Sequence, residues 1–301
     1  MKIRILLLTM LPVICLAQVN PNGEKPAGEL LSKEISPNEM KRNASFNVEE
    51  IKVRWKKAAL ENCTGVLCIN TPPPPSFTCG TSTVTDVDGN IYETVAIVGT
   101  GVTQCWTKTN LKVTMYNDGT VIGDSTNNTW GTAAIGARTG YNVNVVPLSD
   151  YVGTFGYLYN WHAVNDSRKL CPSGWHVPTD AEWTILIQAY DPGALINSTT
   201  QSTTAGTVLK SAVTNSPSGS GLGWDPGTAG TNISGFTALP GGLRLSGSGN
   251  SFSIRTEANF WSATGFGNGL ARNWQLINTS GSVFRSDNDK STGFSVRCLK
   301  D

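Results

Sequence analysis

The sequence predicts an α+β domain built from small antiparallel sheets, one or two flanking helices and long loops. Three observations predict this class. The 301-residue chain is rich in turn-forming residues, with 32 glycines and 15 prolines, and only 15% of its residues are charged. Its C-terminal part alternates short apolar runs with Gly and Asn pairs at intervals of roughly 8 to 12 residues. One capped helix precedes these runs, and the composition suits a β-dominated protein better than a helical bundle or a coiled coil.

The balance of charges excludes some functions. The chain has 23 basic and 22 acidic residues. Cleavage of the N-terminal segment considered next removes Lys2 and Arg4, which leaves 21 basic residues against 22 acidic ones. A net charge so close to zero gives no general attraction to nucleic acid or anionic lipid. We therefore expect no nucleic-acid partner.

Residues 1–17 have the features of a cleaved signal peptide. Two basic residues begin the segment, an apolar stretch follows over 5–16, and small residues precede the expected cleavage before Gln18. The stretch is too short for a transmembrane helix, and no other apolar run approaches that length. Cys15 offers the alternative of a lipoprotein, but Ile14 stands before it, where that processing requires a small residue. We expect a secreted or outer-surface protein.

Export explains the cysteine content. Cleavage removes one of the seven cysteines, and an even number in an oxidising compartment favours disulfides. Six cysteines allow 15 pairings. The pairing that respects the segment boundaries given below is Cys63–Cys68, Cys79–Cys105 and Cys171–Cys298. Metal ligation is the alternative, but the chain has no Cys-x-x-Cys motif and only two histidines, so we expect no metal site.

Residues 18–77 are expected to form a linker outside the main domain. The polar stretch 18–44 carries three prolines and has no periodicity. A short helix is predicted over about 48–61, because apolar residues recur there at helical spacing behind a capping box. Its basic face is a solvated surface or, as the less favoured alternative, a membrane-binding one. Four prolines at 72–75 then form a stiff hinge.

The main domain is expected to begin near Thr78 with a β-hairpin. An Asp-Gly pair separates apolar strands over 83–87 and 91–98, which is a typical hairpin signal. Asp86 and the polar residues after it also resemble the start of a calcium-binding loop. The twelfth position of such a loop carries Glu, whereas Ile97 stands here, so turn chemistry is favoured.

One helix is predicted over 180–190. Thr179 and Glu182 form a capping box, Trp183 begins an apolar stripe, and a Pro-Gly pair ends the helix. A second, short helix is predicted over 208–213. The strands expected after it are 236–239, 243–245, 252–255, 260–263, 273–277, 282–285 and 294–299.

Several motifs occur in an order that resembles a known family. They are Cys79-Gly-Thr, Gln104-Cys-Trp, Tyr157-x-Tyr-Asn-Trp, Cys171-Pro-Ser-Gly-Trp-His-Val-Pro, Gly235-Phe-x-Ala-Leu-Pro-Gly-Gly, Phe260-Trp-Ser and Gly293-Phe-Ser-Val-Arg-Cys. Together they resemble the Fibrobacter succinogenes major paralogous domain of exported bacterial proteins, over roughly 78–301. The resemblance implies a C-type-lectin-like fold with two small antiparallel sheets, flanking helices, long loops and chain ends that meet.

The resemblance implies a fold more firmly than a function. Sugar-binding C-type lectins use Glu-Pro-Asn or Gln-Pro-Asp together with Trp-Asn-Asp. None of these triplets occurs here, because Val164 precedes Asn165 and Asp166. Calcium-dependent sugar binding is therefore not expected. Formylglycine-generating enzymes share the broad fold and use cysteines, but Cys298 is better explained here as a disulfide partner.

The motifs indicate no catalytic group, and we expect neither an enzyme nor a cofactor. His162 and His176 lie in aromatic-rich segments that are typical of packed structural histidines. Glu182 and Glu257 could form a glycosidase pair, but Glu182 already has a capping role. No Gly-x-Ser-x-Gly motif stands between an expected strand and helix.

The remaining signal is a candidate binding surface within 261–292, where aromatic residues stand beside Arg, Asn and Gln. Such mixtures supply contact area and adaptable hydrogen bonds. The candidate ligand-binding residues are Trp261, Arg272, Asn273, Trp274, Gln275, Arg285, Asp287 and Asn288. The alternative is that the two tryptophans belong to the core and the polar residues to turns. The stretch that begins at Ala271 also resembles the variable region of proteins diversified by retroelements, which display altered binding residues on this fold.

These inferences favour an exported, disulfide-stabilised binding or adhesion module that presents the candidate surface to a protein or glycan ligand. The alternative is a structural subunit of a surface filament or envelope assembly that docks a partner through residues 18–77. A carbohydrate-active enzyme without a recognisable motif is the least favoured interpretation.

Overall fold

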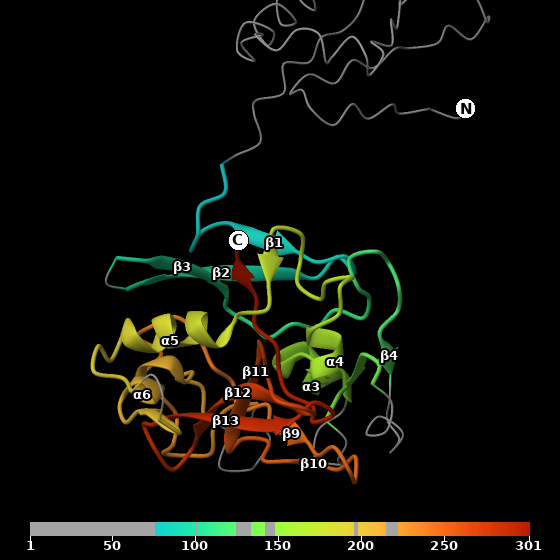
Figure 1. Ribbon diagram of the computed structural model, residues 1–301. Helices are drawn as coiled ribbons and strands as arrows, with labels where there is room; N and C mark the ends of the chain where they lie inside the picture. Colours follow the sequence, from blue (N-terminus) through green and yellow to red (C-terminus); the bar gives the residue numbers. More distant parts are fainter. Residues whose placement is uncertain (1–75, 100, 125–133, 142–147, 196–197, 215–221) are drawn as a thin grey trace, which may run out of the picture. The chain divides into compact units, whose positions relative to one another are not determined.

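The computed structural model describes residues 76–99, 101–124, 134–141, 148–195, 198–214 and 222–301 (Figure 1). The expected signal peptide, the linker helix, the proline hinge and the pair Cys63–Cys68 lie outside these residues. Phe77–Asp301 is a compact unit with its own hydrophobic core. None of its described helices has the length and apolar character needed to cross a membrane.

The first sheet joins the beginning of this unit to the end of the chain. Its strands, in spatial order, are β1 (Thr83–Thr85), β2 (Ile91–Val98), β3 (Thr103–Thr107), β14 (Leu299–Lys300) and β7 (Trp175–His176). Every pairing in it is antiparallel. The predicted hairpin is therefore confirmed, and the C-terminal strand lies beside β3 in the sheet that β1 begins (Figure 1).

The turn between β1 and β2 is held by Asp86. Its Oδ1 accepts the backbone N–H groups of Asp88 (3.0 Å) and Asn90 (2.9 Å), and its Oδ2 accepts the hydroxyl of Tyr92 (2.6 Å). Such local carboxylate bonds favour a tight turn because they replace backbone partners that the turn lacks. The prediction of turn chemistry at this position is confirmed.

The second sheet carries the candidate binding region. Its antiparallel strands, in spatial order, are β11 (Glu257–Phe266), β12 (Leu270–Ile277), β13 (Val283–Asp289) and β8 (Thr200–Ser202). β11 and β12 are longer than the sequence predicted, because both strands continue up to one tight turn that contains Gly267 and Gly269. A shift of register between Trp261 and Gly265 marks a bulge in this hairpin.

One face of the second sheet packs against α5 (Asp180–Gln188). The Glu182 N–H donates to Thr179 Oγ1 (3.3 Å), and the Thr179 N–H donates to the Glu182 carboxylate (2.7 Å), so the predicted capping box is confirmed. Trp183 is 1% exposed and stacks on Trp274 of β12 with ring centroids 6.0 Å apart. It also contacts Trp106 of the first sheet, with centroids 4.8 Å apart. The helix therefore connects the cores of the two sheets.

The other elements are short. They are β4 (Gly123–Asp124), β5 (Ala137–Thr139) and β6 (Leu158–Tyr159) in one sheet, β9 (Leu243–Arg244) paired with β10 (Ser251–Phe252), and the helices α3 (Leu148–Phe155), α4 (Trp161–Val164) and α6 (Ala205–Leu209). The helix expected over 208–213 was wrong in position, because Lys210 leaves α6 with extended backbone (φ −62°, ψ 141°). The strand expected over 236–239 is only a bridge between Ala238 and Lys210. The α+β class with small, mostly antiparallel sheets is confirmed, and the described residues form four sheets, not two.

Arg297 fixes the C-terminal segment in the core. Its guanidinium is fully buried, and its Nε donates to Oδ1 of Asn110 (2.6 Å). The other nitrogens donate to the carbonyl oxygens of Thr107, Phe236 and Thr237, each at 2.8 Å. Burial lowers the pKa of Arg297 to about 9. The arginine of the Gly-Phe-Ser-Val-Arg-Cys motif thus joins three segments, because it donates hydrogen bonds to buried backbone carbonyl groups.

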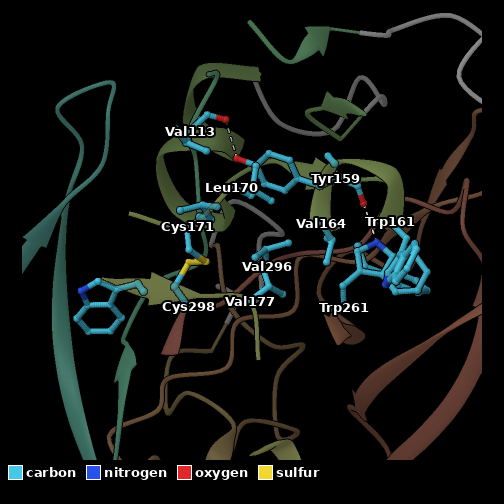
Figure 2. Packing of buried hydrophobic residues seen from close by; sticks show 14 of the residues in the cluster. Val113, Tyr159, Trp161, Val164, Leu170, Cys171, Val177, Trp261, Val296 and Cys298 are labelled. Atoms are coloured by element: carbon cyan, nitrogen blue, oxygen red, sulfur yellow. Dashed lines mark hydrogen bonds between the residues drawn. A yellow bond between two sulfur atoms is a disulfide. The ribbon is translucent and has the colours of Figure 1, made fainter. Parts of the chain in front are cut away.

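The described residues contain two of the three predicted disulfides, and both are present. Cys79–Cys105 joins the start of the unit to β3, with Cα atoms 5.8 Å apart. Cys171–Cys298 joins the segment before β7 to the segment before β14, with Cα atoms 5.9 Å apart. The second disulfide lies in the hydrophobic cluster drawn in Figure 2, together with Val296. These pairings are compatible with an extracellular domain.

Candidate functional site

The candidate binding residues lie on two opposite faces of the second sheet, because side chains alternate along a strand. Trp274 of β12 pairs with Arg285 of β13 and faces α5, where it contacts Trp183. Asn273 and Gln275, the neighbours of Trp274 along β12, therefore face the other way. We call the two sides the α5 face and the polar face. The α5 face carries Arg272, Trp274, Arg285 and Asp287, and the polar face carries Trp261, Asn273, Gln275 and Asn288.

On the α5 face, the charged candidates are paired with each other or with the helix. Nη1 of Arg285 lies 2.9 Å from Oδ2 of Asp180 in the first turn of α5. Nη1 of Arg272 lies 2.8 Å from Oδ1 of Asp287 on the neighbouring strand. Burial raises the pKa of Asp180, with the two arginines opposing that effect. The pair of Arg285 with Asp180 connects the sheet with the helix, and the pair of Arg272 with Asp287 connects two neighbouring strands.

The two tryptophans are core residues. Trp261 and Trp274 are both 0% exposed. Nε1 of Trp261 donates to the carbonyl oxygen of Tyr159 (2.8 Å), as Figure 2 shows, and its ring lies 4.5 Å from that of Phe294. Asn273 is also buried, at 2% exposure. The expectation that these three residues lie on the surface was wrong, and the alternative that the tryptophans belong to the core is confirmed.

The polar face carries a row of hydrogen-bonded polar side chains across three strands. Oε2 of Glu257 on β11 accepts from Nδ2 of Asn259 (3.1 Å) and from Nε2 of Gln275 on β12 (2.9 Å). Oδ1 of Asn273 accepts from Nδ2 of Asn288 on β13 (2.7 Å). Ser286 of β13 stands opposite Asn273 in the strand register and therefore lies on the same face. We call this set the polar row: Glu257, Asn259, Asn273, Gln275, Ser286 and Asn288.

Burial divides the polar row into a supporting part and an accessible part. Asn259 and Asn273 are each 2% exposed, whereas the other members are half-buried. Within the described residues, Oε1 of Glu257, Oε1 of Gln275 and Oδ1 of Asn288 accept no hydrogen bond. The buried amides therefore hold their neighbours in place, and the half-buried groups retain acceptor capacity.

An aromatic ring adjoins the polar row. Phe284 of β13 stands opposite Gln275 in the register and shares the polar face with it. Its side chain is half-buried, in contrast to the fully buried aromatic residues of the α5 face. The polar face thus combines oriented amide and carboxylate groups with one apolar surface.

The suggested pair of Glu182 and Glu257 does not meet across one site. Glu257 belongs to the polar face, whereas Glu182 lies on α5, which packs on the opposite side of the sheet. The Glu182 carboxylate instead accepts from Thr179 and contacts His176 Nε2 at 2.9 Å. His176 therefore has two carboxylate neighbours, since its Nδ1 lies 2.6 Å from Oδ1 of Asp301.

Sequence reasoning missed part of the polar row. The sequence context suggests Glu257 only as one of two possible catalytic carboxylates and suggests no role for Asn259 or Ser286. Only the pairing of strands brings these residues next to Gln275 and Asn288. The available signal was the alternation of polar and apolar residues over 257–260, which becomes informative once the hairpin between β11 and β12 is known.

The fold and the site define a class of protein, namely a disulfide-bonded α+β domain whose second sheet packs on α5 with one face and carries the polar row on the other. The model of the Fibrobacter succinogenes major domain family matches residues 101–300. Because this match covers well over half of the chain, the chain belongs to that family, as its motifs predicted. No curated protein and no solved structure matches the chain.

Proposed function

We propose that the chain is an exported, lectin-like binding or adhesion module that holds a protein or glycan ligand on its polar face and catalyses no reaction. The observation that carries this proposal is the carboxylate of Glu257, which Asn259 and Gln275 hold through hydrogen bonds of 3.1 and 2.9 Å on a half-buried surface. Polar groups that are already held in position lose little conformational freedom when a ligand binds.

Other observations support the finer parts of the proposal. The signal-like residues 1–17 and the two disulfides support secretion or display on the outer cell surface. The pairing of β14 with β3 supports a C-type-lectin-like arrangement, because it brings the chain end to the sheet that begins the unit. The separation of Glu182 from Glu257 by the sheet supports binding in preference to glycoside hydrolysis.

This proposal is tested by immobilising the full chain and measuring how much cell-envelope material it retains. The material should contain surface proteins and polysaccharides together, so that neither ligand class is selected in advance. Gln275→Ala should lower the retained amount, because it removes an accessible amide of the polar row. Gln188→Ala is the matched control, because it removes the same amide from α5, on the other side of the sheet.

Two results would contradict the proposal. Equal retention by the parent and by Gln275→Ala would exclude binding through the polar face. Retention that disappears only when residues 18–77 are deleted would favour the structural-subunit interpretation.

A further inference from the structure

We infer that the ligand of the polar row is a neutral glycan, bound through its hydroxyl groups without a metal ion. This inference rests on the binding role proposed above and specifies the ligand class. It follows from the kinds of groups in the polar row, from the charges that the row lacks and from the backbone edges that are already occupied.

The hydrogen-bonding groups of the polar row match those of a polyol. A sugar hydroxyl both donates and accepts a hydrogen bond, and each carboxamide offers the same two capacities in one plane. In the described structure, the acceptors Glu257 Oε1, Gln275 Oε1 and Asn288 Oδ1 are not used by the protein. Hydrogen bonds with the buried Asn259 and Asn273 hold the side chains of Glu257 and Asn288 in position. Such a fixed set of donors and acceptors favours adjacent hydroxyls.

The charges of the sheet disfavour an anionic ligand and a metal ion. The polar row has one carboxylate, Glu257, and no basic side chain. The arginines of β12 and β13 lie on the other face, where Arg272 and Arg285 pair with Asp287 and Asp180. A phosphate, sulfate or uronic acid at the polar row would therefore meet the negative charge of Glu257, and no member of the row would supply a cation. A calcium site requires six or more oxygen ligands, commonly several carboxylates, and the row offers a single one.

The backbone around the polar row disfavours a peptide that binds as an added strand. β13 has neighbours on both sides, namely β12 and β8. The outer edge of β11 is bridged to Gly242 at Ala258 and to Ser295 at Phe260. Strand addition is therefore blocked at Val283 and Phe284 of β13 and at the two bridged positions of β11, and recognition there must use side chains.

Phe284 supplies the apolar part of such a site. Its half-buried ring stands beside Gln275 on the same face. The carbon-bound hydrogens on one side of a sugar ring form an apolar surface that packs on an aromatic ring, while the hydroxyls at its rim reach polar neighbours.

A glycan panel tests the inference. The full chain should be applied, with a chelator present, to neutral oligosaccharides of glucose, mannose, galactose and xylose and to sulfated and uronic-acid glycans, all at equal density. At least one neutral glycan should be bound. Gln275→Ala and Asn288→Ala should each weaken that binding about fivefold to tenfold, as the loss of a hydrogen bond predicts. Gln188→Ala and Asn268→Ala are the matched controls and should bind as the parent does.

The outcomes separate this inference from the function on which it rests. Binding to anionic glycans alone, binding that the chelator abolishes, or equal weakening by the control variants would overturn the neutral-glycan inference. A protein ligand would give a different set of results. No glycan would bind, Gln275→Ala would still retain less envelope material than the parent, and protease treatment of that material would abolish its retention. In that case only this inference fails. If Gln275→Ala changes neither experiment, the proposed function fails as well.

Discussion

His176 and Glu182 are joined by a hydrogen bond of 2.9 Å that connects β7 with the first turn of α5. The other ring nitrogen of His176 lies 2.6 Å from the carboxylate of Asp301. Because ionised carboxylates only accept hydrogen bonds, both contacts exist together when both ring nitrogens carry protons. The charged imidazole thus connects the helix with the end of the chain that β14 brings to the first sheet.

The pKa values of these two residues shift in opposite directions. The hydrogen bond to Glu182 raises the pKa of His176 above its ordinary value of 6.5, and Asp301 adds to this effect against partial burial. Burial opposes the ionisation of Glu182, but hydrogen bonds from His176 and Thr179 outweigh burial and lower its pKa to about 2.

We expect the contribution of this contact to stability to be greatest between about pH 4.5 and about pH 6.5. The part due to His176 is complete below its ordinary pKa of 6.5 and is lost as the pH rises through the raised pKa of the folded state. The part due to Glu182 is present above its ordinary pKa of 4.5 and is lost as the pH falls towards about 2. Melting temperatures measured from about pH 3 to about pH 9 should decline at both ends.

Two variants separate this contact from other titrating groups. In His176→Gln the alkaline decline should flatten, because the variant has no imidazolium to lose. His162→Gln, which changes the histidine of α4, should retain the decline. A profile of His176→Gln that is superimposable on that of the parent would show that the contact does not contribute to stability.

The disulfides should differ in their contribution to stability and in their accessibility. Cys171–Cys298 spans 127 residues, for which chain entropy gives about 5 kcal/mol, and Cys79–Cys105 spans 26, which gives about 3.5 kcal/mol. Cys171 and Cys298 are buried, whereas Cys79 is half-buried. Alkylation without reductant should label no cysteine after residue 17, and mild reduction should expose Cys79 and Cys105 first. Two or more labelled cysteines before reduction would refute the argument from export.

Trp183→Ala should destabilise the domain by about 3–5 kcal/mol, because it leaves a cavity among large aromatic side chains. The ring of Trp183 contacts those of Trp106 and Phe260, with centroids 4.8 and 5.4 Å apart. Ile233→Ala is the control, since Ile233 is 75% exposed and its truncation should change the free energy of unfolding by less than about 0.5 kcal/mol. Denaturant unfolding measures both variants, and equal midpoints would show that Trp183 does not support the core.

The sequence predicted the features that depend on neighbouring residues. The capping box at Thr179 and the turn at Asp86 use groups within a few positions of each other, so the local pattern contains the whole interaction. The pairing of Cys171 with Cys298 followed from the segment boundaries and not from distance along the chain. The conformation of Lys210 could not be predicted in this way, because it depends on distant residues. Lys210 follows the last residue of α6, and its ammonium group donates to three carbonyl groups, which include those of Ile277 and Ser280.

The face on which each binding candidate lies could not be predicted, because it depends on strand register and on distant partners. Arg285 and Asn288 are three positions apart on β13 and therefore face opposite sides of the sheet. Arg285 is engaged by Asp180, which precedes it by 105 residues. Trp261 and Trp274 have the composition of an interface, but helices α4 and α5 and the segment at Phe294 bury them.

The last prediction concerns Arg285, one of the candidate ligand-binding residues that composition suggested. The side chains of Arg285 and Asp180 are 11% and 18% exposed, so the ion pair is poorly solvated and neither charge is readily replaced by water. Arg285→Ala should therefore lower the melting temperature and leave the affinity for the retained ligand within about twofold. A double-mutant cycle with Asp180→Ala should give a coupling energy of about 1–2 kcal/mol.

Gln275→Ala provides the contrast, because its effects should be reversed. Glu257 keeps the hydrogen bond from Asn259 in this variant, so the free energy of unfolding should change by less than about 1 kcal/mol while the affinity falls. Calorimetric binding and thermal unfolding of both variants, measured side by side, decide between the two faces. If Arg285→Ala loses affinity at an unchanged melting temperature while Gln275→Ala does not, the ligand binds on the α5 face, and the assignment of the site to the polar face is wrong.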